Sequence, residues 1–266
     1  MRWQEQTGPG RGVRLHVRRV VDPPAPPVLL LHGLGVGGVV FQAFARRLLP
    51  FLAAVAPDLR GHGQSDAPSS GYTPPDYALD LAELIGDAEG LTPPLPVVGH
   101  SLGALVALEL ASLRPELVSW LVLLDPPLDP ELPNPEIESV YRLRHSPPGE
   151  LEAYLLERNP GGGKLLADML AQLFRAASDA AFEAMLAGRP FEAPAVGQPT
   201  LVIQADPRKG GILGDAAARA FVERLPNGRL LKIPGAPHAV HASHPVEVAD
   251  AILEFGGYSS GAASSR

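Results

Sequence analysis

One short segment, residues 95–113, limits the fold of this chain more than any other. Residues 95–98 are apolar and predict a buried strand, and residues 104–113 are rich in alanine and leucine with helical spacing. Between them stands Gly99-His100-Ser101-Leu102-Gly103, a Gly-x-Ser-x-Gly motif. Strand, motif and helix together are typical of a nucleophile elbow, a turn so sharp that its central residue takes strained backbone angles. Ser101 is therefore expected at the carboxyl end of a strand, in front of the positive end of a helix dipole.

Strands and helices alternate along most of the chain. Apolar strands are predicted at residues 28–31, 52–56, 95–98, 120–124, 200–204 and 230–233, and a half-exposed strand at 14–21. Helices are predicted at residues 41–49, 75–89, 104–113, 215–225 and 245–255. This alternation with short connections predicts an α/β fold, in which a mostly parallel sheet carries helices on both faces.

Residues 126–198 interrupt the alternation. They contain no good strand but hold helix-like runs at 149–157, 164–174 and 178–187. A single crossover needs only about a dozen residues, so we expect a helical cap over the carboxyl edge of the sheet. The core would then comprise residues 1–125 and 199–255. Residues 256–266 are rich in Gly, Ser and Ala and are expected to be a disordered tail.

Composition excludes several classes of function. The chain has 266 residues, 45% of them hydrophobic, and a formal net charge of −7, which argues against a general nucleic-acid or anionic-membrane surface. It has no cysteine, so a disulfide framework, a thiolate nucleophile and cysteine-ligated zinc are excluded. No signal peptide or membrane-spanning run is evident, so a cytoplasmic protein with a small-molecule substrate is expected. No metal-binding or cofactor-binding motif appears, and neither group is expected.

A serine hydroxyl needs a base to take its proton, and three histidines lie late enough in the chain to serve. His238 lies in a loop directly after the last predicted strand, so it can reach the edge where Ser101 stands. His244 abuts a proline at the start of the last predicted helix and is better placed to cap it, and His241 is intermediate. We therefore predict His238 as the base.

Two carboxylates could orient this histidine. Asp206 follows the strand predicted at residues 200–204, and Asp125 follows the strand predicted at 120–124, so both stand at the edge where open α/β sheets build their sites. Asp215 begins a predicted helix and fits a helix cap better. We favour Asp206 over Asp125 as the acid that keeps the imidazole in the tautomer able to accept the Ser101 proton.

The negative charge formed on the substrate oxygen needs backbone donors, an oxyanion hole. The N–H of Leu102 follows the nucleophile, and a second N–H, most simply that of Leu34, comes from the turn His32-Gly33-Leu34-Gly35. A further glycine-rich turn at residues 58–66 is interpreted as structural, with Arg60 and Asp66 paired around it.

Four short motifs resemble those of a known protein family. They are residues 30–33 (LLHG), 57–66 (PDLRGHGQSD), 99–103 (GHSLG) and 235–238 (GAPH). Together they resemble the α/β-hydrolase fold superfamily, in its single-domain, cap-bearing branch of esterases, lactonases, C–C hydrolases and cofactor-free haloperoxidases. The similarity runs over residues 13–255.

This resemblance implies an eight-stranded sheet, nucleophile Ser101, base His238, oxyanion donors Leu34 and Leu102, and a cap at residues 126–198. The usual acid motif of the family, Gly-x-x-Asp, is not matched at Asp206. Some members place the acid after the preceding strand, 24 residues past the nucleophile, and Asp125 stands there.

The predicted function is hydrolysis of a small or medium carboxylic ester or lactone through an acyl-enzyme. A C–C bond hydrolase or a cofactor-free haloperoxidase would use the same three residues, and a catalytically weak ligand receptor could share the scaffold. The cap would supply apolar wall residues: Leu128, Leu132, Ile137, Leu151, Tyr154, Leu155, Met169, Leu173, Phe174 and Met185.

Overall fold

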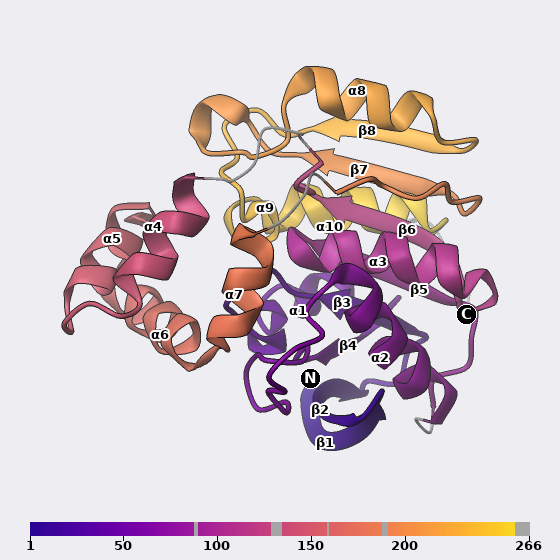
Figure 1. Cartoon of the computed structure of the whole chain (residues 1–266). Coiled ribbons are helices and arrows are strands. Elements are labelled where there is room, and N and C mark those ends of the chain that lie inside the picture. Colours follow the sequence, from indigo (N-terminus) through magenta and orange to yellow (C-terminus); the bar gives the residue numbers. More distant parts are fainter. Residues whose placement is uncertain (88–89, 129–134, 159, 188–190, 259–266) are drawn as a thin grey trace.

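The apolar runs of the sequence become strands of one eight-stranded sheet (Figure 1). The computed structural model describes residues 1–87, 90–128, 135–158, 160–187 and 191–258. The strand order is β1-β2-β4-β3-β5-β6-β7-β8; β1 and β2 run antiparallel to their neighbours and the remaining pairs are parallel. The bounds are β1 Arg2–Gly10, β2 Val13–Asp22, β3 Pro27–Leu31, β4 Ala53–Pro57, β5 Leu95–His100, β6 Val118–Leu124, β7 Thr200–Gln204 and β8 Gly228–Lys232. The predicted mostly parallel α/β sheet is confirmed.

The edge strand β1 was not predicted from the sequence. Residues 2–10 (RWQEQTGPG) are largely polar and include two glycines and a proline, so they lack the apolar pattern of a central strand. The strand pairs antiparallel with β2 along its whole length, with one register shift near Arg2. An edge strand has one hydrogen-bonded neighbour only, which is why a polar sequence suffices here.

Side chains along each strand point alternately to the two faces of the sheet, so both faces are apolar. Helices cover both of these faces (Figure 1). Leu29 and Leu31 of β3 pack with α2 (Pro74–Asp87), α3 (Leu102–Leu113) and α8 (Asp215–Glu223). Val28 and Leu30 pack on the opposite face with α1 (Ala45–Leu48), α9 (Val240–Ser243) and α10 (Pro245–Phe255). This continuous burial on two faces is what the uninterrupted apolar strands predict.

The described part of the segment between β6 and β7 contains four α-helices, which we call the cap segment: α4 (Pro135–Leu143), α5 (Glu150–Arg158), α6 (Gly163–Ala176) and α7 (Asp179–Leu186). They lie to the left of the sheet in Figure 1 and form two small apolar clusters, one around Leu151 and one around Phe182. The helix α4 was not predicted, whereas α5, α6 and α7 match predicted runs.

Short 3-10 turns complete the described elements: η1 (Gly38–Phe41), η2 (Pro115–Leu117), η3 (Pro160–Gly162) and η4 (Pro207–Lys209). Among the described helices, none has the length and apolar character needed to cross a bilayer. Most of the predicted disordered tail, residues 259–266, lies outside the described residues, as does the predicted wall residue Leu132.

Candidate active site

The turn between β5 and α3 has the geometry of a nucleophile elbow. Ser101 has φ 53° and ψ −118°, a left-handed backbone conformation that is strained for a residue with a side chain. It directly precedes Leu102, the first residue of α3, so the free N–H groups of the first helical turn lie next to it. The predicted strand, turn and helix are all present.

The two glycines of the motif are required because the chain packs against itself here. A Cβ atom on Gly99 would lie 2.2 Å from the carbonyl oxygen of Gly103, and a Cβ on Gly103 would lie 2.2 Å from that of Leu31. Both contacts are with backbone atoms, which cannot move aside cheaply.

Gly103→Ala is therefore expected to lower the free energy of unfolding by about 3 kcal/mol, measured by urea denaturation. The matched control is Gly86→Ala in α2, where an added Cβ meets nothing within 4 Å. This control is expected to raise the free energy of unfolding by about 0.5–1 kcal/mol, because alanine favours the helix. Equal stability of the Gly103→Ala variant and the unchanged protein would contradict the close approach.

His238 is joined to Asp125. The Nδ1 atom of His238 lies 2.7 Å from Oδ2 of Asp125, which leaves Nε2 as the nitrogen that can face a serine. Asp125 is fully buried, and its carboxylate also accepts the N–H groups of Ala205 (3.2 Å), Ile212 (2.9 Å) and Leu213 (3.4 Å). Asp125 has φ 43°, a second strained position at the end of a central strand. The geometry of a His–carboxylate pair is thus built on β6 and on the loop after β8.

Asp206, which the sequence favoured as the partner of His238, is engaged elsewhere, and that expectation is corrected here. Its side chain accepts from the guanidinium of Arg208 (2.9 and 3.1 Å) and from the N–H groups of Arg208 and Gly235 (3.0 Å each). The Arg208 guanidinium, with the amides of Gly235 and Arg208, holds the pKa of Asp206 far below its usual range. Asp206 thereby ties the end of β7 to the loop that leads to His238.

The turn after β3 lies against the nucleophile. A Cβ atom on Gly33 would come within 3.2 Å of the Ser101 Cβ, so the backbone there runs beside Ser101. The Nε2 atom of His32 accepts the N–H of Leu59 (2.9 Å), so its Nδ1 carries the proton and donates to the carbonyl of Gly33 (2.7 Å). Because that carbonyl shares a peptide plane with the N–H of Leu34, His32 fixes the direction of the predicted oxyanion donor.

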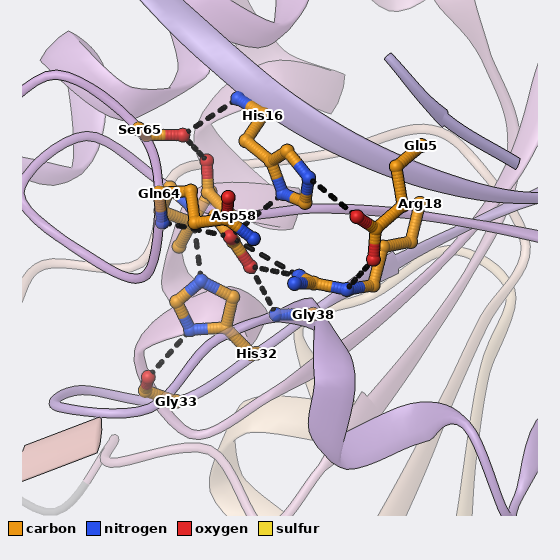
Figure 2. Close-up of polar contacts among 10 residues, drawn as sticks. Glu5, His16, Arg18, His32, Gly33, Gly38, Asp58, Gln64 and Ser65 are labelled. Carbon is orange, nitrogen blue, oxygen red and sulfur yellow. Dashed lines mark hydrogen bonds and ion pairs between the residues drawn. The ribbon is translucent and has the colours of Figure 1, made fainter. Parts of the chain in front are cut away.

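The buried carboxylate of Asp58 is hydrogen-bonded to the turn after β3 (Figure 2). Asp58, which follows β4, accepts the N–H of Gly38 (2.7 Å) and of Gln64 (3.0 Å) and pairs with Arg18 (3.1 and 3.2 Å) and His16 (3.0 Å). The network links β2, the turn after β3 and the glycine-rich turn after β4. Sequence reasoning missed Asp58, although its place after a buried strand was the available signal.

The pairing predicted for the glycine-rich turn was wrong. Arg60 binds the buried Asp80 of α2 (2.5 and 2.6 Å), and Asp66 binds Arg14 of β2 (2.9 Å). Arg60 therefore pairs with helix α2 and Asp66 with strand β2, and these two ion pairs fix the turn between the helix and the strand.

The other late histidines occupy separate positions. His241 is buried, with its ring 4.9 Å from the ring of Phe41, and its Nδ1 has no partner among the described residues. His244 occupies the N-cap position of α10, and its Nδ1 lies 3.0 Å from Ser243 Oγ. Of the three histidines, His238 is the one that the structure pairs with a carboxylate. His100, which the sequence did not single out, contacts the His238 carbonyl through Nε2 (3.1 Å).

Buried histidines are expected to make the stability of the protein depend on pH, because burial lowers the pKa of His32, His62, His100 and His241. Burial, which disfavours the charged imidazole, lowers the pKa of His62 and that of His241 to about 3 each. The unfolded chain therefore binds more protons than the folded one between about pH 3 and pH 6.5. The free energy of unfolding should fall as pH drops through this window, by up to about 1.4 kcal/mol per pH unit for each group.

Urea denaturation at a series of pH values from 7 to 5 measures how the free energy of unfolding depends on pH. His241→Phe should remove one of these contributions and make the slope of the free energy of unfolding against pH shallower, by up to the equivalent of one proton. Phe41→Leu, which changes packing against the same ring without removing a titratable group, should leave the slope as it is. An identical slope for His241→Phe would show that His241 is not held neutral.

A cavity of about 490 Å³ brings these groups together. Ser101, His238 and Leu34 line it, as do the cap-segment residues Ile137, Tyr154, Leu155, Met169 and Phe174, all five predicted as wall residues. Most of the lining is apolar. No hydrogen bond joins the described Ser101 and His238 side chains, and catalytic hydrogen bonds commonly tighten only when substrate binds.

The predicted wall residues Leu128, Leu151 and Met185 pack elsewhere: Leu151 in the interior of the cap segment, Leu128 and Met185 against the main core. Within the described parts of the chain, no group of three His, Cys, Asp or Glu side chains is arranged to hold a metal ion.

The comparison with protein families decides what kind of protein carries this site. The model of the alpha/beta hydrolase family matches residues 28–251. The chain belongs to the alpha/beta hydrolase family. The match spans β3 to α10 and so includes the elbow, both candidate acids and His238.

Two relatives match most of the length of this chain. It is 30% identical to a 2-(acetamidomethylene)succinate hydrolase of Mesorhizobium japonicum, over 86% of this chain and 87% of that protein. Among solved structures, a thermophilic esterase of Thermogutta terrifontis is 25% identical, with a TM-score of 0.77, covering 96% of this chain and 98% of that one.

An uncharacterized protein of Mycobacterium tuberculosis is 36% identical to this chain over 137 residues. That match covers 51% of this chain and 38% of the mycobacterial protein, so the chain spans well under half of that relative's length.

Proposed function

We propose that this hydrolase cleaves a small or medium carboxylic ester or lactone, with Ser101 as nucleophile, His238 as general base and Asp125 as the acid that orients it. The observation that carries the proposal is the 2.7 Å contact between His238 Nδ1 and the buried Asp125, beside a cavity that Ser101 also lines. The strained elbow and the esterase among the relatives support it.

The first step forms an acyl-enzyme. His238 Nε2 takes the proton of the Ser101 hydroxyl while Oγ bonds to the carbonyl carbon of the substrate, which pushes the π electrons onto the carbonyl oxygen. The N–H groups of Leu34 and Leu102 hold that negative oxygen, and Asp125 stabilises the imidazolium of His238. When the intermediate collapses, His238 gives its proton to the departing alkoxide, which leaves as an alcohol.

The second step restores the enzyme. His238 takes a proton from water as the water oxygen bonds to the acyl carbon, and the oxyanion donors again hold the negative charge. The intermediate then expels Ser101 Oγ, which takes the proton back from His238. The carboxylic acid is released, and no external oxidant or metal is needed for the balance.

Assays with three substrate classes test the proposal: p-nitrophenyl esters, aliphatic lactones and a vinylogous diketone. We expect hydrolysis of the ester or the lactone and a loss of that activity in Ser101→Ala. Turnover of the diketone with neither ester nor lactone cleaved would point to C–C bond hydrolysis by the same residues. Tight ligand binding with no turnover of any substrate would favour a receptor.

A further inference from the structure

His100 connects the strand of the nucleophile with the loop of the base. It is the last residue of β5, directly before Ser101, and it is buried. Its Nε2 atom lies 3.1 Å from the main-chain carbonyl oxygen of His238. Because a carbonyl oxygen can only accept a hydrogen bond, Nε2 of His100 carries the proton and donates it. The second residue of the Gly-x-Ser-x-Gly motif is therefore bonded to the backbone of His238.

The ring of His100 is uncharged near neutral pH. Burial, with His238 and His241 close by, holds the pKa of His100 well below its usual range. The centre of its ring lies 4.6 Å from that of His238 and 4.7 Å from that of His241. Because His100 is neutral, it places no like charge beside the imidazolium that His238 becomes when it accepts a proton. His100 can therefore stay in contact with His238 in both protonation states of the base.

The loop that carries His238 has few other ties to the sheet. Asp206 holds residues 235–236 at the end of β7, through bonds of 3.0 and 2.9 Å. The carbonyl of His238 also accepts the N–H of Val240 (2.9 Å), but that bond is local to the loop and the start of α9. Among the described hydrogen bonds, the one that joins the main chain of His238 and its two neighbours to the sheet comes from His100.

We propose that His100 is a positioning residue of the reaction, whose Nε2–H group holds the carbonyl of His238 so that the free imidazole nitrogen reaches Ser101. The inference rests on the proposed function and adds a residue to it. Asp125 fixes Nδ1 of His238 and His100 fixes its backbone, and these two attachments set the direction of the ring. The His238 side chain is 27% exposed, so packing alone leaves the ring room to turn. A misplacement of about 1 Å at a reacting group costs on the order of 100-fold in rate.

Two substitutions separate the hydrogen bond from the packing of the ring. His100→Gln keeps an N–H donor at about the reach of Nε2 and removes the ring, whereas His100→Phe keeps a ring and removes the donor. With p-nitrophenyl butyrate, His100→Phe is expected to lower kcat by about 10- to 100-fold and to leave KM within about twofold, because the base is displaced while the apolar cavity is retained. His100→Gln should keep kcat within about threefold of the unchanged protein.

His100→Asn tests the same bond through its reach. The asparagine amide is one methylene shorter and falls short of the His238 carbonyl, so kcat should be as low as in His100→Phe. The comparison of glutamine with asparagine therefore stands even if His100→Phe does not fold, which urea denaturation shows. Gln198→Leu is the matched control, because it removes a buried donor to the carbonyls of Ala111 (3.2 Å) and Pro115 (3.3 Å) and does not line the catalytic cavity. It should lower stability and leave kcat unchanged.

The Nδ1 proton of His238 gives a readout that needs no turnover. Because this proton is hydrogen-bonded to the buried Asp125, it should give a low-field ¹H resonance, which is identified by its absence from His238→Ala protein. We expect a sharp resonance in the unchanged protein and in His100→Gln, and a broadened one in His100→Phe, where the loop of the base loses its tie to β5.

Three outcomes overturn the proposal: a kcat of folded His100→Phe within about threefold of the unchanged protein, equal kcat in His100→Gln and His100→Asn, or the same Nδ1 resonance in all three variants. Low kcat in His100→Asn with activity kept in His100→Gln supports it. If the unchanged protein cleaves neither ester nor lactone, the proposed function fails instead, and the resonance then decides this inference by itself.

Discussion

Replacement of Ser101 by alanine is expected to lower kcat for p-nitrophenyl butyrate by about 10⁵- to 10⁶-fold, with little change in the binding of product. The reason is that the acyl-enzyme can no longer form, and only the oxyanion donors and the apolar cavity remain to act on the carbonyl. Steady-state kinetics at high enzyme concentration measure the residual rate. Thermal unfolding shows whether the elbow tolerates the smaller side chain.

Ser119→Ala is the matched control for this change. Ser119 lies on β6, and its hydroxyl is buried without a described hydrogen-bond partner. This control should keep full activity. If Ser101→Ala kept more than about a hundredth of the activity, the nucleophile would have to be another group.

Asp125→Asn is expected to lower kcat by about 10⁴-fold, the size of effect seen when the acid of such a triad becomes an amide. The amide NH₂ of asparagine can donate to His238 Nδ1, which favours the tautomer whose Nε2 carries the proton and cannot accept one from Ser101. The asparagine also faces the N–H groups of Ala205, Ile212 and Leu213, so the variant should unfold at lower urea concentration.

Asp206→Asn is the variant to compare with Asp125→Asn, because the pair tests which carboxylate is the acid. Asp206 binds Arg208 and the Gly235 amide and has no contact with the His238 side chain among those described. We expect kcat to stay within about tenfold of the unchanged protein, while stability falls because the loop before His238 loses its tie to β7. A loss of activity in Asp206→Asn with activity retained in Asp125→Asn would reverse the assignment.

The elbow could be predicted from sequence because its requirements are local. The strand, the two glycines, Ser101 and the helix follow one another within 19 residues. The close backbone contacts that exclude a Cβ at Gly99 and Gly103 arise within this unit and the neighbouring β3, so the motif itself carries the information. His238 was predicted for a similar reason, since it directly follows the turn after the last strand.

The partner of His238 could not be decided from sequence because the choice is non-local. Asp125 and Asp206 stand at the ends of the adjacent parallel strands β6 and β7, so position along the sheet edge does not separate them. What separates them is the set of partners around each carboxylate: backbone amides of residues 205, 212 and 213 face Asp125, and Arg208 folds back on Asp206. The spacing from Ser101 to Asp125 was the available signal.

The ion pairs of the glycine-rich turn show the same limit. Arg60 and Asp66 are close in sequence and opposite in charge, yet they pair with Asp80 and Arg14. Packing of α2 and β2 against the turn brings those partners in, and no pattern within residues 58–66 encodes that packing. Local motifs therefore pointed to the candidate site, and tertiary contacts decided which charges meet in and around it.

The most direct test of the account is covalent labelling with a fluorophosphonate probe, followed by mass spectrometry of the digested protein. The account predicts one label on the peptide that contains Ser101, no label in folded Ser101→Ala protein, and much slower labelling in Asp125→Asn than in Asp206→Asn. Folded, unchanged protein that resists the probe, or a label on a different residue, would contradict it.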